Sequence, residues 1–227
     1  MMARHSPLVT RATSNVAKGH KAPVGHGSIL IISAPSGSGK STLVKRLIAA
    51  VPGVCFSVSY TTRPPRTTEK HGRDYFFVSQ KVFERMVTRG EFVEWANVYG
   101  HLYGTAYKQL QAAQKAGQDI LLDIDVQGHQ QVRRRLAEAV SVFILPPSYQ
   151  ELARRLRSRH SDAAEEIERR LQTARQEIAH WDEYDYVVVN DHLENATQAL
   201  RAIVRAARFR RANQAARSEK IVGTFGG

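Results

Sequence analysis

The segment SILIISAPSGSGKST, residues 28–42, constrains the fold of this chain more than any other part of its sequence. Its first six residues form an apolar run that the following Ala-Pro pair ends, as expected of a buried strand. Helical spacing of apolar residues then continues from Ser41 to Val51, where Pro52-Gly53 ends it. A strand, a glycine-rich turn and a helix in this order predict a phosphate-binding loop.

The turn contains the groups that hold a bound triphosphate. Gly37 and Gly39 allow the backbone to curl so that its N–H groups point inward, and Lys40 can then reach the β- and γ-phosphates. Ser41 can ligate Mg²⁺. A purely structural turn would not require a lysine and two hydroxyl groups directly after it. The residues expected to bind the triphosphate are Ala34, which replaces the first glycine of the usual pattern, Pro35, Ser36, Gly37, Ser38, Gly39, Lys40, Ser41 and Thr42.

Apolar runs and helical segments alternate through the second half of the chain. Continuous apolar strands between helices favour a parallel sheet covered on both faces, which defines an α/β core. The strands are expected at 120–125, 141–145 and 184–189, and the helices at 109–116 and 130–138, as a pair after Pro146-Pro147, and from a cap at Asp191 to about Arg217.

Residues 54–108 have a different texture and predict an inserted subdomain. Short β-like pieces at 56–60, 75–78 and 92–99 flank a helical piece at 81–89, and glycine and aromatic residues lie near the turns. The expected architecture is therefore an α/β core that carries a mixed α+β insert.

The charge of the chain favours an anionic ligand. The net charge is +12, and residues 1–68 contain nine Lys or Arg but no Asp or Glu. A second basic concentration, from Arg154 to Arg175, lies on a predicted helical stretch. Two separated basic zones favour a cleft for several phosphates over a flat duplex-binding face, with general surface basicity as the alternative.

Bulk features narrow the class further. The chain has 227 residues, 42% of them hydrophobic, which is enough for one domain with inserts. Cys55 is the only cysteine, so no intramolecular disulfide is possible, which suits a cytoplasmic protein. No apolar run approaches the roughly 20 residues that span a bilayer. Residues 1–26 lack hydrophobic periodicity and are expected to form a disordered basic extension, with a transit peptide as the alternative.

Carboxylates and arginines beyond the loop complete a candidate site for phosphoryl transfer. Asp123 and Asp125 close the strand ILLDID, and their spacing would place both side chains on one face, where a carboxylate can hold Mg²⁺. Capping of the next turn is the alternative. Arginine forks suit phosphoryl oxygens, although a solvated helix face paired with glutamates explains the same pattern. The arginines are Arg154, Arg155, Arg157, Arg159, Arg169 and Arg170, and the nearby glutamates are Glu165, Glu166 and Glu168.

Taken together, these motifs resemble those of guanylate kinases, which phosphorylate GMP with ATP. The resemblance runs from about residue 28 to about residue 200, and it rests on SAPSGSGKST, SVSYTTRPPR, GRDY with FFV, GEFVEWA, LYGT, ILLDIDVQG, LPPS and VVVND. It implies one domain of residues 27–217, followed by a flexible tail of residues 218–227. The domain would comprise a P-loop kinase core (27–55, 109–146 and 178–217), a GMP-binding insert (56–108) and a helical lid (147–177).

The resemblance also implies ligands and residue roles. ATP with Mg²⁺ would be the donor and GMP the acceptor, with dGMP as a second candidate, and neither a nucleic acid nor a membrane is expected as a partner. Guanine offers N1–H and 2-amino donors that Glu94 can accept, a pair that adenine does not match. By similarity, the GMP phosphate would contact Arg63, Arg66, Tyr75 and Tyr103, and the guanine would contact Ser59, Glu94 and Asp125, with Thr105 nearby. The catalytic residues would be Lys40, Asp123, Arg155, Arg159 and Arg170, with Ser41 and Asp123 at the metal and Asn190 beside the adenine.

Three other functions compete for the same residues. A guanylate-kinase-like module that binds phosphopeptides should lack the loop lysine or the lid arginines, yet Lys40 and Arg155 are present. A kinase of sugar phosphates would not need the proposed guanine readers Ser59 and Glu94. A basic nucleic-acid-binding ATPase is supported only by the acid-free N-terminal part and the C-terminal arginines.

The stretch TTRPPRTTEKHGRDY becomes the acceptor half of the site in this interpretation. Arg63 and Arg66 are three residues apart, separated by two prolines, and we expect them to converge with Tyr75 from the following strand. Lys70 and Arg73 are expected to face solvent.

Overall fold

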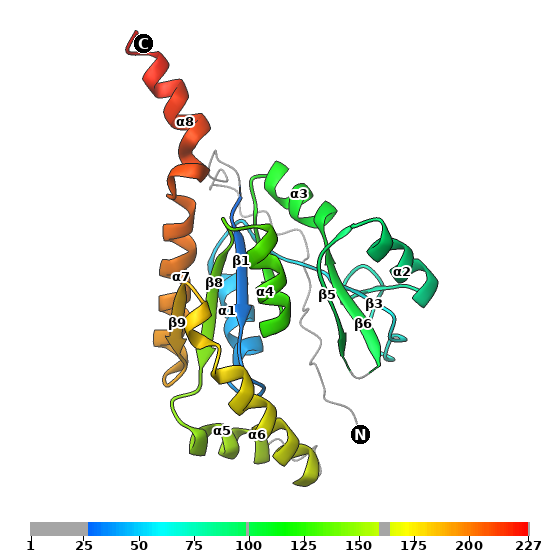
Figure 1. Ribbon diagram of the computed structural model, residues 1–227. Helices are drawn as coiled ribbons and strands as arrows, with labels where there is room; N and C mark the ends of the chain where they lie inside the picture. The colour runs from blue at the N-terminus through cyan, green and yellow to red at the C-terminus, as the bar shows by residue number, and fades with distance from the viewer. Residues whose placement is uncertain (1–26, 99, 159–163, 227) are drawn as a thin grey trace.

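The computed structural model describes residues 27–98, 100–158 and 164–226 (Figure 1). The expected extension at residues 1–26 lies outside the described residues, as does Arg159. The structure confirms the α/β class, because a parallel sheet flanked by helices stands beside a separate mixed sheet.

The core sheet has five strands, all parallel, in the order β2-β7-β1-β8-β9. Their bounds are β1 Ile29–Ser33, β2 Val54–Phe56, β7 Asp119–Asp123, β8 Val140–Leu145 and β9 Tyr186–Val189.

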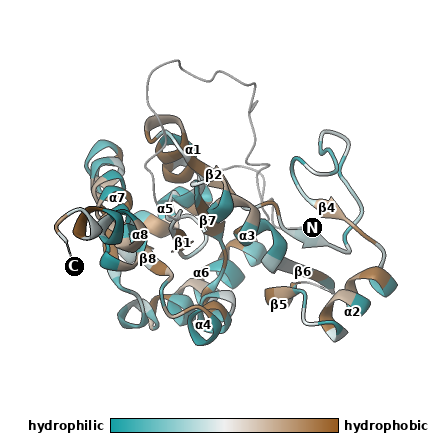
Figure 2. Ribbon diagram, turned by 90° about the horizontal axis from the view of Figure 1, so that it is seen from above, coloured by the Kyte–Doolittle hydropathy of each residue, from teal (hydrophilic) through white to brown (hydrophobic). Residues whose placement is uncertain are grey.

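Helices cover both faces of this sheet because its central strand is apolar on both sides. Leu30 and Ile32 pack in one cluster with side chains of α1 and α7, whereas Ile29 and Ile31 pack in another with side chains of α3 and α4. Figure 2 shows the sheet from above, with these helices around it and the insert to one side. The helices are α1 Lys40–Ala50, α3 Tyr107–Lys115, α4 Val126–Arg135 and α7 Leu193–Arg208.

The insert forms its own sheet and its own small core. Its four strands run in the order β4-β3-β6-β5, with β3 parallel to β4 and antiparallel to β6. Phe83 and Phe92 stack at the centre of the apolar cluster beneath it. The elements are β3 Tyr60–Thr61, β4 Phe76–Phe77, α2 Gln80–Thr88, β5 Phe92–Val98 and β6 His101–Ala106.

A helical pair lies beyond the end of the sheet at which β1 runs into the glycine-rich turn (Figure 1). The pair consists of α5 Tyr149–Arg157 and α6 Ala164–Ile178, which pack through an apolar cluster of their own. The α5 side chains of Leu152 and Leu156 lie so close to Gly37 that a Cβ on this glycine would meet them at 2.9–3.0 Å. The pair therefore covers the turn directly.

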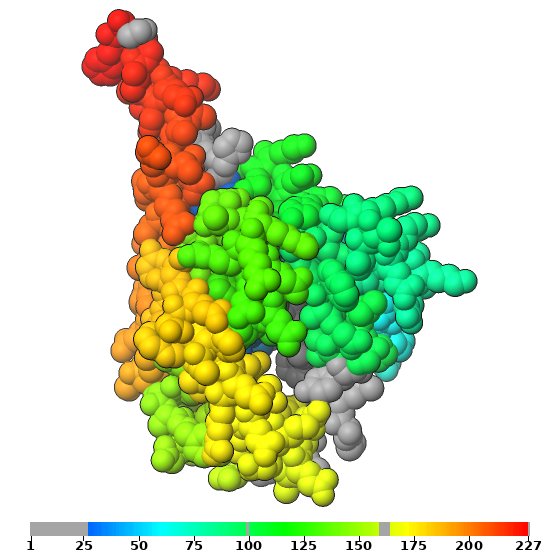
Figure 3. Space-filling model, viewed as in Figure 1, coloured from blue at the N-terminus to red at the C-terminus, as the bar shows by residue number. Residues whose placement is uncertain are grey.

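The C-terminal region differs from the expected single helix that runs to about Arg217. The 3₁₀ turn η1 Trp181–Glu183 and strand β9 lead into α7, which ends at Arg208. A second helix, α8 Arg211–Gly223, buries none of its residues and projects from the body (Figure 3). The break is stabilised because the Asn213 and Gln214 side chains donate to the carbonyls of Ala207 and Arg208, the last residues of α7. Residues 218–223 of the expected tail belong to α8, and the flexibility of residues 218–227 stays a prediction.

Four smaller expectations also need correction. Strand β9 was expected to be buried, but it lies at the edge of the sheet and exposes three of its four residues. Asp191 was expected to cap α7, but the N-cap residue is His192. The His192 N–H donates to the side chain of Asp191. Phe56, placed in the insert, pairs with Leu121 in the core sheet, and α3 begins at Tyr107, two residues before the expected helix.

No helix within the described ranges is both long enough and apolar enough to cross a membrane.

Asp119, the first residue of β7, joins three parts of the core. Its carboxylate accepts the Ser28 N–H at 2.8 Å and the Arg208 Nε at 2.7 Å. The Asp119 side chain is only 4% exposed, so these partners compensate for the loss of its hydration. The start of β1, the start of β7 and the end of α7 are therefore held by one buried charge.

We predict that Asp119→Ala lowers the free energy of unfolding by about 3 kcal/mol, because it leaves a half-buried guanidinium and a buried N–H without their acceptor. Urea denaturation, read as a change in midpoint at constant slope, measures this. Arg46→Ala is the control, since it removes an exposed pair with Glu194 and should cost under about 1 kcal/mol. Equal losses in the two variants would contradict the prediction.

Candidate functional site

The glycine-rich turn has the geometry of a phosphate loop. Gly37 and Gly39 have φ values of 94° and 87°, in the left-handed region that favours glycine. Helix α1 begins at Lys40 directly after them, so its N-terminal N–H groups point at the space enclosed by the loop. The expected strand, turn and helix are confirmed here.

Asp123 reaches the loop because β7 lies next to β1. Ile32 pairs with Asp123 in the parallel register, so both strands end at the same edge of the sheet. There the Lys40 ammonium and the Asp123 carboxylate form a partly buried ion pair. The structure thus brings together two residues of the expected catalytic group that are far apart in the sequence.

Asn190 holds the loop from the far side. Its side-chain amide donates to the Ser38 carbonyl at 2.7 Å, and its own carbonyl accepts Nη2 of Arg155 at 3.0 Å. A Cβ on Gly39 would collide with this amide, so glycine is required there for space as well as for φ. Asn190 therefore lies at the loop, where its side-chain amide contacts the loop backbone. Its predicted place beside the adenine stays a prediction.

Two of the arginines expected to be catalytic, Arg155 on α5 and Arg170 on α6, are paired with glutamates one helical turn away. Arg155 donates to Glu151 and Arg170 to Glu166, both at the i,i+4 spacing of an ordinary helix face. Arg170 is nevertheless buried. Arg155 donates to the carbonyl of Asn190, the residue whose side chain holds the loop. Arg159, the third arginine expected to be catalytic, lies outside the described residues.

The expectation that Asp123 and Asp125 share one strand face is wrong. Strand β7 ends at Asp123, and Asp125 is the N-cap of α4, whose side chain accepts the Gly128 N–H at 2.8 Å. The chain turns between the two residues because the free N–H groups at the start of a helix need an acceptor. Capping, the alternative that the sequence left open, is what the structure shows for Asp125.

Glu94 presents a buried carboxyl group beside that cap. It is 5% exposed, on β5, opposite Thr105 on β6. Burial raises the pKa of Glu94 to about 7, and the nearby Asp125 carboxylate adds to the effect. A Cβ on Gly128 would lie 3.2 Å from Glu94 Oε2, so the first turn of α4 closes directly over this carboxyl group.

Helix α4 also ties the insert to the core. The Gln131 side chain exchanges two hydrogen bonds with the backbone of Trp95, at 3.2 and 2.9 Å. Arg135 donates to the carbonyls of Phe92 and Val93 at 2.6 and 2.8 Å. Strand β5, and with it Glu94, is therefore positioned against the helix that Asp125 caps.

The acceptor residues expected around the insert also come together. Arg63 is 7% exposed, donates to the Tyr103 hydroxyl at 3.2 Å and lies 5.5 Å from the Tyr75 ring centroid. Tyr75 and Tyr103 meet edge to face, with centroids 5.8 Å apart. Burial is the main cause that raises the pKa of Tyr75 to about 12, so its hydroxyl keeps the proton and can donate it.

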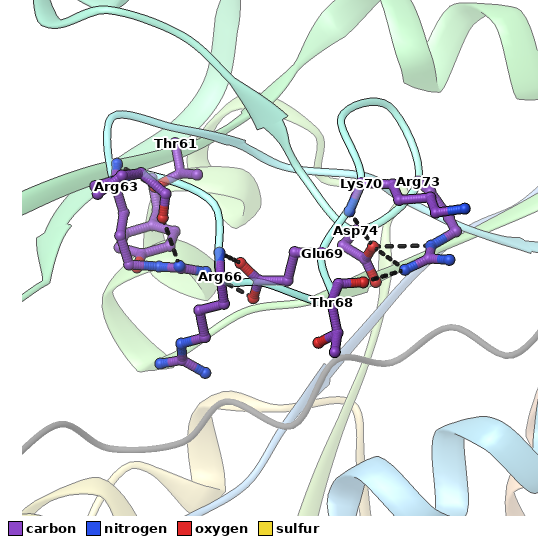
Figure 4. Close-up of polar contacts among 10 residues, drawn as sticks. Thr61, Arg63, Arg66, Thr68, Glu69, Lys70, Arg73 and Asp74 are labelled. Carbon is purple, nitrogen blue, oxygen red and sulfur yellow. Dashed lines mark hydrogen bonds and ion pairs between the residues drawn. The ribbon is translucent and has the colours of Figure 1, made fainter.

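Figure 4 shows the loop from Thr61 to Asp74, in which the Glu69 carboxylate lies beside Arg63 and Arg66. Glu69 accepts from the Arg63 guanidinium and from the Arg66 main chain. Arg73, expected to face solvent, is partly exposed and pairs with Asp74, and Lys70 is exposed as expected. Ser59 accepts the Phe76 N–H with its carbonyl, directly before β3, and Thr105 lies on β6 opposite Glu94.

Three residues of the site were not foreseen: Glu69, Gly128 and Glu177. Glu69 and Gly128 lie inside motifs, yet no pattern separates their roles from those of their neighbours. Glu177, on α6, has a buried carboxyl oxygen without a hydrogen-bond partner among the described residues, and burial raises its pKa to about 7. Nothing in its helical spacing distinguishes it from an exposed glutamate.

The residues at the loop fit a Mg²⁺ ion that is shared with phosphates. Within the described residues, no group of three or more His, Cys, Asp or Glu is placed to hold a metal ion by itself. Mg²⁺ in nucleotide sites takes one or two protein oxygens and completes its shell with phosphate and water. The Asp123 carboxylate beside Lys40 and the neighbouring Ser41 hydroxyl provide such a set.

A parallel sheet with a phosphate loop, an inserted subdomain with a mixed sheet of its own and a helical pair over the loop together define a P-loop nucleoside monophosphate kinase. The guanylate kinase family model matches residues 26–207. The chain belongs to the guanylate kinase family, and it is an enzyme that phosphorylates GMP to GDP with ATP.

Similar proteins cover nearly the whole chain. The guanylate kinase of Koribacter versatilis is 53% identical over 82% of this chain and 82% of its own length. That of Nitrosomonas europaea is 47% identical over 87% of this chain and 98% of its own length. Among solved structures, the crystal structure of guanylate kinase from Anaplasma phagocytophilum is 36% identical, with a TM-score of 0.65 over 83% of this chain and 90% of that chain.

We predict that Asn190→Ala raises KM for ATP about tenfold and leaves KM for GMP close to its original value. The substitution leaves the Ser38 carbonyl without its donor and loosens the loop, while the acceptor side keeps its contacts. Steady-state kinetics with each substrate varied in turn measure the two constants. Gln198→Ala, on the exposed side of α7, is the control. A parallel rise of both constants would contradict a role confined to the loop.

Proposed function

We propose that the chain transfers the γ-phosphoryl group of ATP directly and in line to the phosphate of GMP, without a covalent enzyme intermediate. The acceptor is already an anion, so no strong general base is needed. Rate enhancement would come from positioning and from neutralisation of charge. The observation that carries this proposal is that Lys40 and Asp123 form an ion pair at the loop, while the insert carries a buried Glu94 on β5.

The loop would hold the donor. The loop of residues 34–42 would enclose the triphosphate and bind it through backbone N–H groups at the start of α1, and Lys40 would exchange its partner Asp123 for the phosphate oxygens. Ser41 and Asp123 would hold Mg²⁺, which when bound neutralises charge on the β- and γ-phosphates. Arg155, Arg159 and Arg170 would neutralise charge on the phosphoryl group in transit.

The insert would hold the acceptor. Arg63, Arg66, Tyr75 and Tyr103 would bind the GMP phosphate, and the buried contacts of Arg63 with both tyrosines support this grouping. Glu94 would accept the two donor groups of guanine, with Ser59, Thr105 and the remaining oxygen of Asp125 completing the recognition of the base. Adenine lacks the matching donors and would leave the Glu94 carboxylate unpaired.

We also propose that the chain consists of one fixed part and two moving parts. The five-stranded core would stay fixed. The insert, expected at 56–108 and narrowed here to 57–106 because Phe56 pairs in the core sheet and α3 begins at Tyr107, would close over the two nucleotides, and so would the helical lid expected at 147–177. The separate apolar clusters of the insert and of the pair support this division, because each can move as a unit. Closure would exclude water and so prevent wasteful hydrolysis of ATP.

Lys40→Ala tests the donor half of the proposal. We predict a fall in kcat of about a thousandfold or more, because a charge that acts on the transferring group is lost, while the Kd for GMP stays close to that of the original protein. ADP formation and calorimetric titration with GMP measure the two effects. Lys45→Ala, exposed on the same helix, should retain kcat. Retention of turnover by the Lys40 variant would overturn the donor assignment.

Glu94→Gln tests the acceptor half. The glutamine keeps the size of the side chain but offers one acceptor and one donor to the two donors of guanine, so KM for GMP should rise about a hundredfold or more. KM for ATP should stay close to its original value. The preference for GMP over AMP, measured as the ratio of kcat/KM values, should fall by the same factor. An unchanged preference would show that Glu94 does not read the base.

The raised pKa of Glu94 gives this assignment a pH signature. Only the ionised carboxylate accepts both guanine donors, and protonation dominates below the pKa of about 7. From pH 8 to pH 6, kcat/KM for GMP should therefore fall about tenfold. The phosphate of GMP also titrates, near pH 6, and contributes to the fall of kcat/KM in both proteins. Glu94→Gln should keep this contribution but lose the fall near pH 7. The same dependence of kcat/KM on pH in the variant and the original protein would refute the assignment.

A further inference from the structure

Arg63 is held in one orientation from three directions. Its Nη2 donates to Glu69 Oε1 at 2.9 Å, its Nε to the Tyr103 hydroxyl at 3.2 Å, and its Nη1 to the Pro64 carbonyl at 2.8 Å. The side chain is only 8% exposed and that of Glu69 only 1%. A planar guanidinium with these partners has lost nearly all its rotational freedom before any ligand arrives.

The second oxygen of the same carboxylate holds the second arginine. Glu69 Oε2 accepts the main-chain N–H of Arg66 at 2.8 Å, and the Glu69 N–H donates in return to the Arg66 carbonyl at 3.0 Å. Figure 4 shows the Arg66 side chain running away from the carboxylate. One buried carboxylate therefore connects the side chain of Arg63 to the backbone of Arg66, across the two prolines between them.

A carboxylate at this place is electrostatically unfavourable for a phosphate ligand. Arg63 and Arg66 together carry two positive charges, and Glu69 reduces their sum to one. Burial would raise the pKa of Glu69, but the Arg63 guanidinium and the Arg66 N–H more than offset this and hold the pKa below its usual range. The carboxylate is therefore ionised at neutral pH and repels an approaching anion.

We propose that Glu69 is a positioning residue for the phosphate of the acceptor nucleotide, and that the orientation it imposes on the two arginines outweighs its repulsion of the phosphate. It touches no reacting atom. The proposal rests on the proposed function, in which Arg63 and Arg66 bind the GMP phosphate. A preorganised pair of arginines spends less free energy on ordering when a phosphomonoester dianion binds, which is the general advantage of fixed sites.

Repulsion and positioning predict opposite results for Glu69→Gln. If charge alone mattered, removal of a negative charge beside the phosphate would lower KM for GMP. Glutamine, however, has one oxygen acceptor for two donors, and its amide would face the N–H of either Arg63 or Arg66. Positioning therefore predicts that KM for GMP rises about tenfold or more, with KM for ATP close to its original value.

Guanosine separates positioning of the phosphate from general packing of the insert. It carries the base and ribose but no phosphate, so its inhibition constant against GMP should be the same in Glu69→Gln and the original protein. Glu69→Asp keeps the charge but is too short to span both donors, and a smaller rise in KM for GMP is expected. Glu84→Gln, exposed on α2 of the same insert, is the matched control and should change neither constant.

Each alternative outcome has a distinct meaning. A lower or unchanged KM for GMP in Glu69→Gln would overturn the proposal in favour of charge alone, and a guanosine inhibition constant that rises in parallel would overturn it in favour of packing. If Glu69→Gln does not fold, an unchanged KM for GMP in Glu69→Asp would overturn it equally. The KM for GMP of Arg66→Ala is measured alongside. If neither Arg66→Ala nor Glu69→Gln raises KM for GMP, the proposed acceptor site itself is wrong. If Arg66→Ala raises it strongly and Glu69→Gln does not, only the role of Glu69 is refuted.

Discussion

The parallel pairing of β1 with β7 is the constraint on which the rest of the site depends. Ile32 lies opposite Asp123, so the phosphate loop and the carboxylate leave the sheet at the same edge, and Lys40 meets Asp123 there. Both strands are buried on both faces. A register shift of one residue would move the side chains of each face into the opposite apolar layer, so packing fixes the register strongly. The catalytic geometry is thus a consequence of how the core packs.

The insert buries the carboxyl groups of Glu69 and Glu94 in a chain whose net charge is strongly positive. Glu69 and Glu94 are both nearly inaccessible, yet their pKa values shift in opposite directions. Glu69 has a guanidinium and an N–H as direct partners, which stabilise the ionised form. Burial raises the pKa of Glu94 to about 7, and the nearby carboxylate of Asp125 adds to this rise. The first arrangement holds a permanent structural charge, and the second leaves a carboxyl group that changes its protonation near neutral pH.

Local patterns predicted most of the elements, including the strand, glycine-rich turn and helix of the loop. The apolar run before the glycines and the alternation of strands and helices have short-range causes, and the structure agrees with them. The errors arose where local patterns are ambiguous. The run YDYVVV ends in three valines and therefore predicted a buried strand, but its position at the sheet edge leaves most of it exposed. ILLDID suggested two carboxylates on one strand face, whereas the second became a helix cap because α4 starts there. The break between α7 and α8 depends on side-chain bonds back to the last carbonyls of α7, which helical spacing does not reveal.

The amino-acid sequence was sufficient to establish the phosphate loop, the α/β class and the resemblance to guanylate kinases, because each rests on residue types at short, regular spacing. Only the tertiary structure established which charges meet. Lys40 with Asp123, Arg63 with Tyr103, and Ser38 with Asn190 join residues that are far apart in the chain. Ionisation depends in the same way on burial and on distances to groups from other elements. The sequence contains Glu69 and Glu94 as two ordinary glutamates, and the fold makes one a fixed anion and the other a carboxyl group that titrates near neutrality.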